Sequence, residues 1–269
     1  MRSAARHRST RPASDAQHPE GAGLRSRPLC HERPVAFTHG SASSSEEYAI
    51  GALRKAGWWL ADYAYAGYWQ LRAAFDRADA AGYASGDAAH IVVLPGVYET
   101  WRFMQPLVAA MHERGHPVHV VDTLHRNQRP VGDMARAVAD FLEQRDLTDV
   151  ILVAHSKGGL AGKVVMTGSA GTRVRSMLAI ATPFGGSRYA RLMLSRTLRE
   201  FSPEDPAIVS LARQLDVNER IVSIYASFDP HIPEGSELAG ARNVRLDTGG
   251  HFRILADPRV LAELAVLAQ

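Results

Sequence analysis

The sequence predicts an α/β protein whose core is a mostly parallel sheet of about six strands, with helices on both faces. Short unbroken runs of Val, Ile and Leu alternate with longer segments of helical periodicity, as in sheets buried on both sides. One such run, at 150–154, passes directly into a tight turn and a helix-like segment. The 269 residues, 46% hydrophobic and 22% charged, suffice for one large domain with a well-buried core.

The charge of the chain is unevenly distributed. Residues 1–33 contain seven arginines and three acidic residues, which gives this segment a charge of about +4. Because the net charge of the whole chain is +3, the remaining residues together carry about −1. A basic nucleic-acid-binding face on the folded part is therefore not expected. Residues 1–45 also lack periodicity and are rich in Arg, Ser, Pro and Gly, which predicts a disordered basic extension.

Two further features bear on the environment of the protein. Its only cysteine is Cys30, so no intrachain disulfide can form. No apolar run approaches the roughly 18 residues of a membrane-spanning helix, and no apolar segment follows the arginine-rich start as it would in a secretory signal. We therefore expect a cytoplasmic protein with no transmembrane segment.

An aromatic helix is predicted at 46–78, where Ser44 and Ser45 offer a cap. Apolar residues recur at helical spacing along one stripe: Ile50, Leu53, Gly57, Leu60, Ala64, Tyr68, Leu71 and Phe75. The same segment holds three of the four tryptophans, Trp58, Trp59 and Trp69, together with Tyr63 and Tyr65. Core packing of this segment against the following domain is the expected use. Contact with an acyl pocket or a lipid surface is the alternative.

Beyond a short linker at 83–87, strands and helices alternate. Strands are predicted at 90–94, 116–121, 150–154, 174–181, 220–226 and 243–246. Helices are predicted at 98–113, 132–144, from the turn at Ser156 to about 167, and at 252–267. The segment 184–219 interrupts this alternation, so residues 46–269 are predicted to form a single domain with one insert.

The turn after the third strand carries a candidate nucleophile. The stretch Ala154-His155-Ser156-Lys157-Gly158 places a serine at the apex of a strand–turn–helix junction, the setting of a nucleophile elbow. Small residues at 154 and 158 let the strand and the helix approach closely, so that the hydroxyl of Ser156 is exposed at the sheet edge.

A serine nucleophile requires a base, and the base requires an orienting acid. Only His231 and His251 follow Ser156, and His251 lies in a glycine-containing turn after the last strand, so His251 is the predicted base. Asp229, just past the fifth strand, is the predicted acid, with Asp247 as its rival. Asp122 precedes the serine and breaks the usual Ser–acid–His order.

Two backbone N–H groups are expected to form an oxyanion hole. One belongs to Lys157, directly after the nucleophile, and the other to Val97, because Pro95 has no N–H. Tyr98 is a candidate for the pocket wall. A Ser–Lys dyad using the side chain of Lys157 is the weaker alternative for the base.

Other residues complete the predicted site. His155 and Phe184 are further candidates for the substrate pocket. No Cys/His cluster, paired-carboxylate site or phosphate-binding glycine loop is evident, so no metal or cofactor is expected.

The combination resembles the α/β-hydrolase superfamily, and more narrowly bacterial triacylglycerol lipases and esterases, over about residues 88–269. The residues that carry the resemblance are Ala154-His155-Ser156-Lys157-Gly158-Gly159-Leu160, Ala181-Thr182-Pro183-Phe184-Gly185-Gly186-Ser187, Ser227-Phe228-Asp229 and Gly250-His251-Phe252. The resemblance implies an α/β-hydrolase fold and an acyl-enzyme on Ser156. The insert at 184–219 falls where that superfamily has cap or lid elements. A mobile cover over an acyl pocket and structural packing over the sheet are both open for it.

The chain departs from the pattern of that superfamily in three places. The first position of the elbow is Ala154, where the commoner pattern has glycine. The oxyanion loop begins Pro95-Gly96 where many lipases have His-Gly, and the usual first two strands are replaced by the aromatic helix. These departures bear on the substrate more than on the fold.

The predicted function is that of a serine carboxylester hydrolase acting on a small-molecule ester or a lipid. A thioesterase, amidase or acyltransferase using the same three residues is the alternative, because the residues do not select the leaving group. A third reading is a non-catalytic binding protein on a hydrolase scaffold. The oligomeric state is left open.

Overall fold

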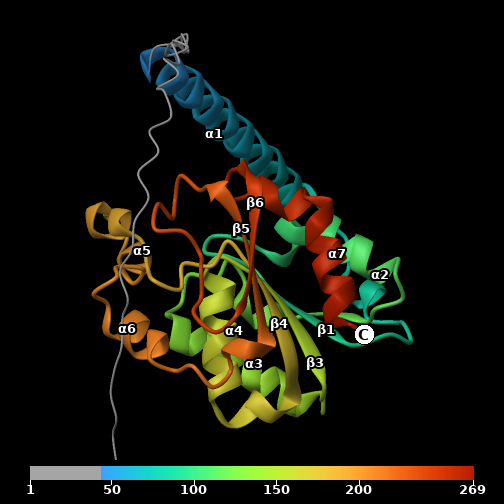
Figure 1. The fold of residues 1–269 in the computed structure, drawn as a ribbon. Helices are drawn as coiled ribbons and strands as arrows, with labels where there is room; N and C mark the ends of the chain where they lie inside the picture. Colours follow the sequence, from blue (N-terminus) through green and yellow to red (C-terminus); the bar gives the residue numbers. More distant parts are fainter. Residues whose placement is uncertain (1–43) are drawn as a thin grey trace, which may run out of the picture. The chain divides into compact units, whose positions relative to one another are not determined.

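The computed structural model describes the backbone of residues 44–269 and the side chains from residue 51 onward (Figure 1). Six strands form one sheet in the order β2-β1-β3-β4-β5-β6, and every neighbouring pair is parallel. The strands are β1 (Ile91–Leu94), β2 (Val118–Val120), β3 (Val150–His155), β4 (Val174–Ile180), β5 (Ile221–Phe228) and β6 (Arg242–Gly249). The predicted parallel α/β architecture is confirmed. The extension predicted at 1–45 falls mostly on residues 1–43, outside the described residues.

Helices lie in the connections from β1 to β5, whereas the described segment between β5 and β6 contains no helix. The α-helices are α1 (Ser44–Phe75), α2 (Gln105–His112), α3 (Val131–Gln144), α4 (Lys157–Thr167), α5 (Arg196–Arg199), α6 (Pro206–Ala212) and α7 (Pro258–Leu267). Within residues 44–269, none of the helices combines the length and the apolar character needed to cross a bilayer.

Two predicted helices begin differently from the expectation. The helix predicted at 98–113 starts as the 3-10 turn η2 (Trp101–Met104) before α2, and the one predicted at 252–267 starts as η7 (Arg253–Ala256) before α7. In both cases a proline lies in the first turn of the α-helix that follows. Proline is favoured there because its missing N–H would have no helical partner.

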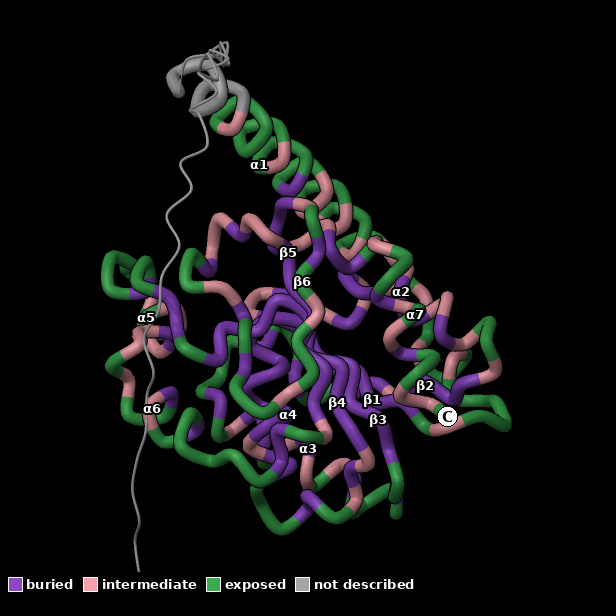
Figure 2. Tube along the Cα trace, in the orientation of Figure 1, coloured by how far each residue is buried: buried purple, intermediate pink, exposed green. Residues whose placement is uncertain are grey.

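The strands β1, β3 and β4 are almost entirely buried (Figure 2). Successive residues of the central strands alternate between two hydrophobic cores. In β1, Val92 and Leu94 join the core formed with α3 and α4, whereas Ile91 and Val93 join the core formed with α2 and α7. This alternation follows from the two-residue period of a strand. It explains why the strands are continuous apolar runs in the sequence.

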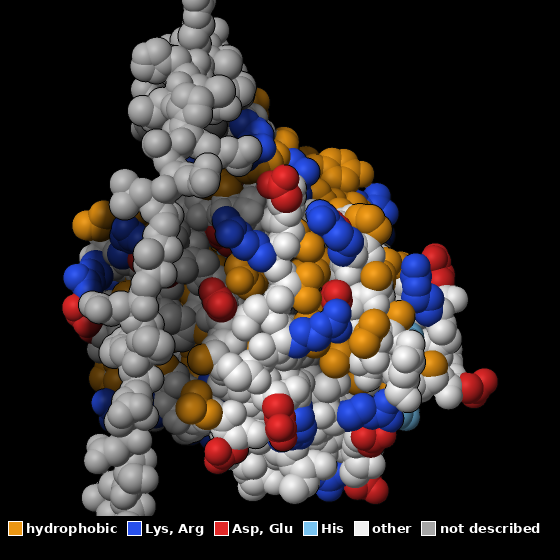
Figure 3. Space-filling view, in the orientation of Figure 1, with side chains coloured by type: hydrophobic (Ala, Val, Ile, Leu, Met, Phe, Trp, Pro, Cys, Tyr) orange, Lys and Arg blue, Asp and Glu red, His pale blue; other side chains and the backbone are white. Residues whose placement is uncertain are grey.

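The α1 helix packs on the protein as expected, but through several of its aromatic residues, and the predicted apolar stripe faces away from the protein. Its exposed members include Leu53 at 73%, Leu60 at 67% and Leu71 at 63% of their full surface. Hydrophobic side chains with Lys and Arg among them are visible in this upper part of the molecule (Figure 3). The opposite face packs on the protein through Trp58, Asp62, Tyr65, Ala66 and Trp69.

The insert predicted at 184–219 connects β4 to β5. It contains η5 (Arg188–Leu192), α5, α6 and η6 (Asn218–Arg220), all short. Two side-chain hydrogen bonds tie it to loops at the carboxyl ends of the strands: Tyr98 Oη to Ser195 Oγ at 2.8 Å, and Ser187 Oγ to the carbonyl of His231 at 2.6 Å. The insert is therefore anchored beside the edge where ligands bind in parallel α/β sheets.

Candidate active site

Ser156 lies at the turn between β3 and α4 in a backbone conformation that L-residues rarely adopt, with φ 51° and ψ −118°. Its amide donates to the carbonyl of Ile180 on the neighbouring strand at 2.8 Å, which holds the turn in place. A strained turn of this kind is maintained only when the surrounding structure overdetermines it. The result is a serine hydroxyl presented at the carboxyl edge of the sheet, as in a nucleophile elbow.

Two glycines after the serine let α4 pack directly on the strands. A Cβ atom at Gly158 would lie 2.1 Å from the carbonyl oxygen of Leu94, and one at Gly159 would lie 2.0 Å from Oγ1 of Thr182. Neither contact is sterically possible. The Gly158-Gly159 pair of the predicted elbow is therefore required by the close approach of the helix to β1 and to the turn after β4.

Gly158→Ala is expected to lower the free energy of unfolding by about 3 kcal/mol, because the added methyl group overlaps a backbone atom that cannot move aside. Urea denaturation followed by circular dichroism measures this loss. The matched control is Gly67→Ala on α1, where nothing lies within 4 Å of the added carbon; alanine there is expected to stabilise the helix by about 0.5–1 kcal/mol. Equal stability of the two variants would contradict the packing described for the turn.

A continuous chain of hydrogen bonds joins Ser156, His251 and Asp229. The Nε2 atom of His251 lies 3.0 Å from Oγ of Ser156, and its Nδ1 atom lies 2.8 Å from Oδ2 of Asp229. All three residues are buried, with 7%, 5% and 8% of their surfaces exposed. The imidazole can therefore accept the serine proton while its other nitrogen donates to a carboxylate shielded from water.

Asp229 is held by more than the histidine. Its Oδ1 atom accepts from the amides of His231 and Ile232 at 2.7 and 3.1 Å. Burial alone would raise the pKa of the Asp229 carboxyl, but His251 and the His231 amide outweigh it and lower the pKa below its usual range. Asp229 is thus kept ionised beside the imidazole.

The pairing with Asp229 also shifts the pKa of His251, but upward. Burial alone would lower its pKa, whereas the charges of Asp229, Glu99 and Asp62 raise it, and the net shift is upward. The imidazolium form is therefore stabilised. His231, whose ring centre lies 4.9 Å from that of His251, has its pKa lowered to about 4 by burial and by His251, so it stays neutral.

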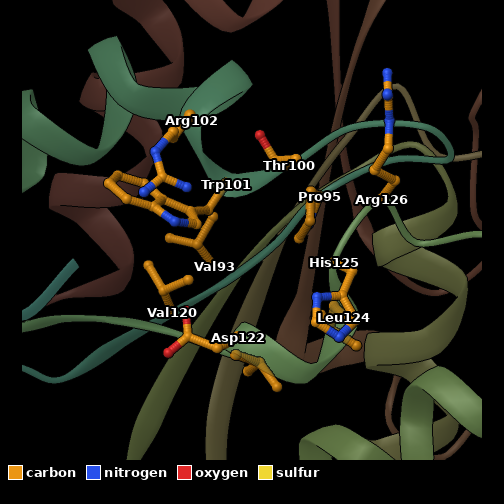
Figure 4. A pocket seen from close by; sticks show the side chains of 11 residues that line it. Val93, Pro95, Thr100, Trp101, Arg102, Val120, Asp122, Leu124, His125 and Arg126 are labelled. Atoms are coloured by element: carbon orange, nitrogen blue, oxygen red, sulfur yellow. The ribbon is translucent and has the colours of Figure 1, made fainter. Parts of the chain in front are cut away.

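The rival acids do not reach His251. Asp247 is an exposed residue of β6. Asp122 lines a separate cavity of about 360 Å³ between the ends of β1 and β2, where Figure 4 shows it below Trp101 and Arg102. The structure thus places Asp229, and neither rival, against the base.

The side chain of Lys157 does not reach the serine. Its ammonium group donates to the carbonyls of Asn127 and Arg129, and burial lowers its pKa to about 8. The side chain is thus committed to a neighbouring loop, which leaves no basis for a Ser–Lys dyad.

Ser156 opens into a pocket of about 400 Å³. Val97 and Tyr98 of the loop after β1 line it, together with His231 and with a mainly apolar wall from the insert. The insert residues in this wall are Ser187, Tyr189, Ala190, Met193, Leu198 and Phe201. The pocket is therefore enclosed by the segment that interrupts the strand–helix alternation.

Two expected pocket residues lie elsewhere. Phe184 is in the core beside α4, with its ring centre 5.9 Å from Nζ of Lys163, because the chain turns inward after β4 before the insert begins. His155 is fully buried, since the residue before the apex of the turn points into the protein. Tyr98, in contrast, lines the pocket as expected.

His155 instead connects two loops of the site. Its Nε2 atom lies 3.0 Å from the carbonyl oxygen of His251, and its Nδ1 atom lies 2.9 Å from Oε2 of Glu99. The same Glu99 oxygen accepts from the amide of Gly96 at 2.7 Å. The loop after β1, the serine turn and the histidine loop are thereby joined by one buried polar network.

Glu99 and Asp62 take part in this site and were not identified from the sequence. Tyr63, which lines the pocket, belongs to the aromatic segment for which contact with an acyl pocket was the alternative expectation. Glu99 is surrounded by ordinary loop residues and leaves no pattern. Asp62 leaves a weak one: it is the only acidic residue between Glu47 and Asp76, in a segment otherwise apolar or basic. An isolated acid on a helix face rich in Trp and Tyr is a signal of a specific buried partner.

Among the side chains that the structure describes, from residue 51 onward, no group of three or more His, Cys, Asp or Glu is placed to hold a metal ion.

By sequence, no family model and no curated protein matches the chain. By structure, it is similar to the lipase BlEst2 of Bacillus licheniformis in its mature form, with a TM-score of 0.54 and 18% identity over 68% of this chain and 93% of that one. It also matches an extracellular α/β-hydrolase from a Paenibacillus species (TM-score 0.47, 17% identity, 67% and 98% covered). A third match is the enol-lactonase from Burkholderia xenovorans LB400, with a TM-score of 0.48 and 16% identity over 68% of this chain and 93% of that one. With the six-stranded parallel sheet and the serine turn, the lipase match shows that the chain has the α/β-hydrolase fold.

Proposed function

We propose that the protein is a serine carboxylester hydrolase that works through an acyl-enzyme on Ser156. The observation that carries the proposal is the hydrogen-bond chain Asp229–His251–Ser156 on the floor of an apolar pocket. A serine hydroxyl is a poor nucleophile by itself, and this arrangement is the recurrent way in which proteins activate it.

Acylation begins when Oγ of Ser156 attacks the ester carbonyl carbon and its proton passes to Nε2 of His251. Asp229 accepts a hydrogen bond from Nδ1 and stabilises the imidazolium that forms. When the tetrahedral intermediate collapses, the C–O bond to the alcohol breaks, and His251 returns the proton to the departing oxygen. In deacylation a water molecule gives a proton to Nε2 of His251 as its oxygen attacks the acyl carbon. The bond between that carbon and Oγ of Ser156 then breaks, His251 returns the proton to Oγ, and the carboxylic acid leaves.

The negative oxygen of the tetrahedral intermediate requires N–H donors. Lys157 is the first residue of α4, so its amide has no helical partner. The amide of Gly96 is already engaged by Glu99, which leaves that of Val97, beside Ser156 in the pocket wall, as the second donor. These are the backbone groups that we assign to the oxyanion hole.

The apolar wall favours an ester with an apolar acyl group. Met193, Leu198 and Phe201 of the insert and Ile232 and Phe252 near the base line the pocket with few polar groups. Burying apolar substrate surface against such residues contributes about 25 cal/mol for each Å². We further propose that the insert acts as a cap over the acyl group and excludes water from it.

Two measurements test this function. The full-length protein is incubated with a fluorophosphonate probe, which should attach one label to Ser156. It is then assayed on a series of esters from acetyl to palmitoyl, and on thioesters and amides of matched acyl length. Activity on the esters is the expected result. Preferential cleavage of thioesters or amides would replace the carboxylester assignment, and a protein neither labelled nor active would contradict catalysis by Ser156.

The pH dependence of kcat/KM is expected to show an acid limb above the ordinary histidine value of about 6.5. The base must be neutral to accept the serine proton, and Asp229, Glu99 and Asp62 raise the pKa of His251 against the opposing effect of burial. Activity should therefore be lost as the pH falls through this raised pKa. His231 adds no limb near neutral pH because its pKa is about 4.

The measurement is kcat/KM on an uncharged ester between about pH 5 and pH 9. An acid limb well below the ordinary histidine pKa would contradict this account. It would show that the acidic groups around His251 do not raise its pKa.

A further inference from the structure

The carboxylate of Asp62, on α1, is bonded to the backbone of the histidine loop. Oδ2 of Asp62 accepts from the amide of His251 at 2.9 Å, and Oδ1 accepts from the amides of Phe252 and Arg253, each at 2.8 Å. Asp62 is fully buried. A buried carboxylate with three N–H donors forms strong charge-assisted hydrogen bonds, and these fix the positions of the donors.

These three amides lie just before η7 (Arg253–Ala256) and at its first residue. The N-cap residue of η7, Phe252, makes no side-chain capping hydrogen bond. Asp62 supplies that acceptor from a helix 189 positions earlier in the chain. The carbonyl of His251 is held as well, by Nε2 of His155 at 3.0 Å. Both backbone polar groups of the proposed base are thus bonded to side chains that do not line the pocket.

The two glycines before His251 make room for α1. A Cβ atom at Gly250 would lie 2.5 Å from Oδ1 of Asp62, and one at Gly249 would lie 2.5 Å from the ring of Trp58. Gly250 also has φ +124°, which disfavours other residues. The Gly-Gly pair that the sequence suggested as a flexible turn is in fact the surface on which α1 docks.

The helix reaches two further loops of the site. The hydroxyl of Tyr63 lies 3.1 Å from Nε2 of His231, two residues past the proposed acid. The amide nitrogen of Gln70 donates to the carbonyl of Tyr98 at 3.3 Å, in the loop that supplies the Val97 donor, where Tyr98 has φ 61°. One side of α1 therefore contacts the base loop, the acid loop and the oxyanion loop.

We propose that α1 is a working part of the catalytic site and that Asp62 is a positioning residue, which holds the loop of His251 so that its imidazole meets Ser156. This inference rests on the proposed hydrolase function. It assigns to the N-terminal helix a role that its exposed apolar stripe does not suggest. It also accounts for an isolated buried acid on that helix.

Asp62→Asn and Asp62→Ala test the proposal in the full chain. Asparagine keeps the shape but replaces one acceptor by an NH₂ group that faces a backbone donor, so kcat is expected to fall about 10-fold. Alanine removes every acceptor, and we expect a fall of about 100-fold, the size of effect that misplacing a reacting group by about 1 Å produces. KM should change much less, because Asp62 does not touch the pocket.

The pH profile separates positioning from mere stabilisation of the fold. The charge of Asp62 raises the pKa of His251, so the acid limb of kcat/KM should move to lower pH in Asp62→Asn. The other titratable groups around the imidazole are unchanged in this variant: Asp229, Glu99, His155 and His231. A variant that only unfolded more easily would lose active protein without moving this limb.

Asp79→Asn is the matched control. Asp79 is also a carboxylate that caps a 3-10 turn, accepting from the amide of Ala81 at 3.1 Å at the start of η1 (Ala80–Tyr83), but it is exposed and outside the pocket. It should keep wild-type activity and the wild-type pH profile. Thermal melts and fluorophosphonate labelling rates accompany each variant.

The outcomes distinguish this inference from the function on which it rests. If the wild type is labelled and active and both Asp62 variants stay within about two-fold of it, the role of Asp62 is refuted and the function stands. A loss of kcat with an unmoved acid limb and a strongly lowered melting temperature would reduce Asp62 to a structural residue. An inactive, unlabelled wild type would overturn the function first.

Discussion

Ser156→Ala is expected to lower kcat/KM on any ester that the wild type hydrolyses by about 10⁵-fold or more, and to abolish fluorophosphonate labelling. The variant loses the hydroxyl that we propose as the nucleophile. What remains is the polarising effect of the pocket on an attacking water molecule. Because alanine has no hydroxyl to bond His251, the substitution leaves Nε2 of that histidine without its partner at 3.0 Å.

A buried serine elsewhere in the sheet provides the control. Ser176 on β4 is 6% exposed, and within the described residues its hydroxyl has no hydrogen-bond partner. Ser176→Ala should therefore retain both labelling and activity. Residual labelling of Ser156→Ala, or equal losses in the two variants, would point to a nucleophile other than Ser156. Circular dichroism of both variants excludes unfolding as the cause.

Asp229→Asn is expected to lower kcat by about 10⁴-fold with little change in the fold. The asparagine oxygen can replace Oδ1 and continue to accept from the amides of His231 and Ile232, so the turn is preserved. The new NH₂ group then faces Nδ1 of His251, where a carboxylate oxygen stood at 2.8 Å. This favours the tautomer with its proton on Nε2, which can no longer accept the proton of Ser156.

Asp247→Asn is the matched control for the acid, because Asp247 was its rival in the sequence and is exposed on β6. We expect this variant to stay within about two-fold of the wild type. The comparison uses kcat on one ester under identical conditions. A large loss of kcat in Asp247→Asn with a small one in Asp229→Asn would mean that Asp247, and not Asp229, orients His251 during turnover.

Much of the fold could be predicted from the sequence because its signals are local. Each strand of a sheet covered on both faces is a short continuous apolar run, so β1, β3, β4 and β5 stood out by composition alone. The serine turn could be found because its close packing requires small residues at fixed positions after the nucleophile. Periodicity then identified the helices, although not the 3-10 turns with which two of them begin.

The α1 helix shows where such local signals are insufficient. Its apolar stripe is real, but periodicity reveals only that a helix has two different faces, and it does not specify which of them meets the protein. The structure buries the other face, which carries Trp58, Asp62 and Tyr65, because these side chains fit the glycine pair of the histidine loop and the ring of Phe103. Shape and hydrogen bonding decided the contact here.

From the sequence alone came the α/β architecture, the serine turn and the chain order of Ser156, Asp229 and His251. Only the tertiary structure decided which acid meets the base, which residues line the pocket, and that Asp62 holds the histidine loop from 189 positions away. Strands, helices and tight turns impose periodic or positional demands on neighbouring residues. A hydrogen bond between distant segments requires only one donor and one acceptor, so it leaves no pattern in either segment until folding brings them together.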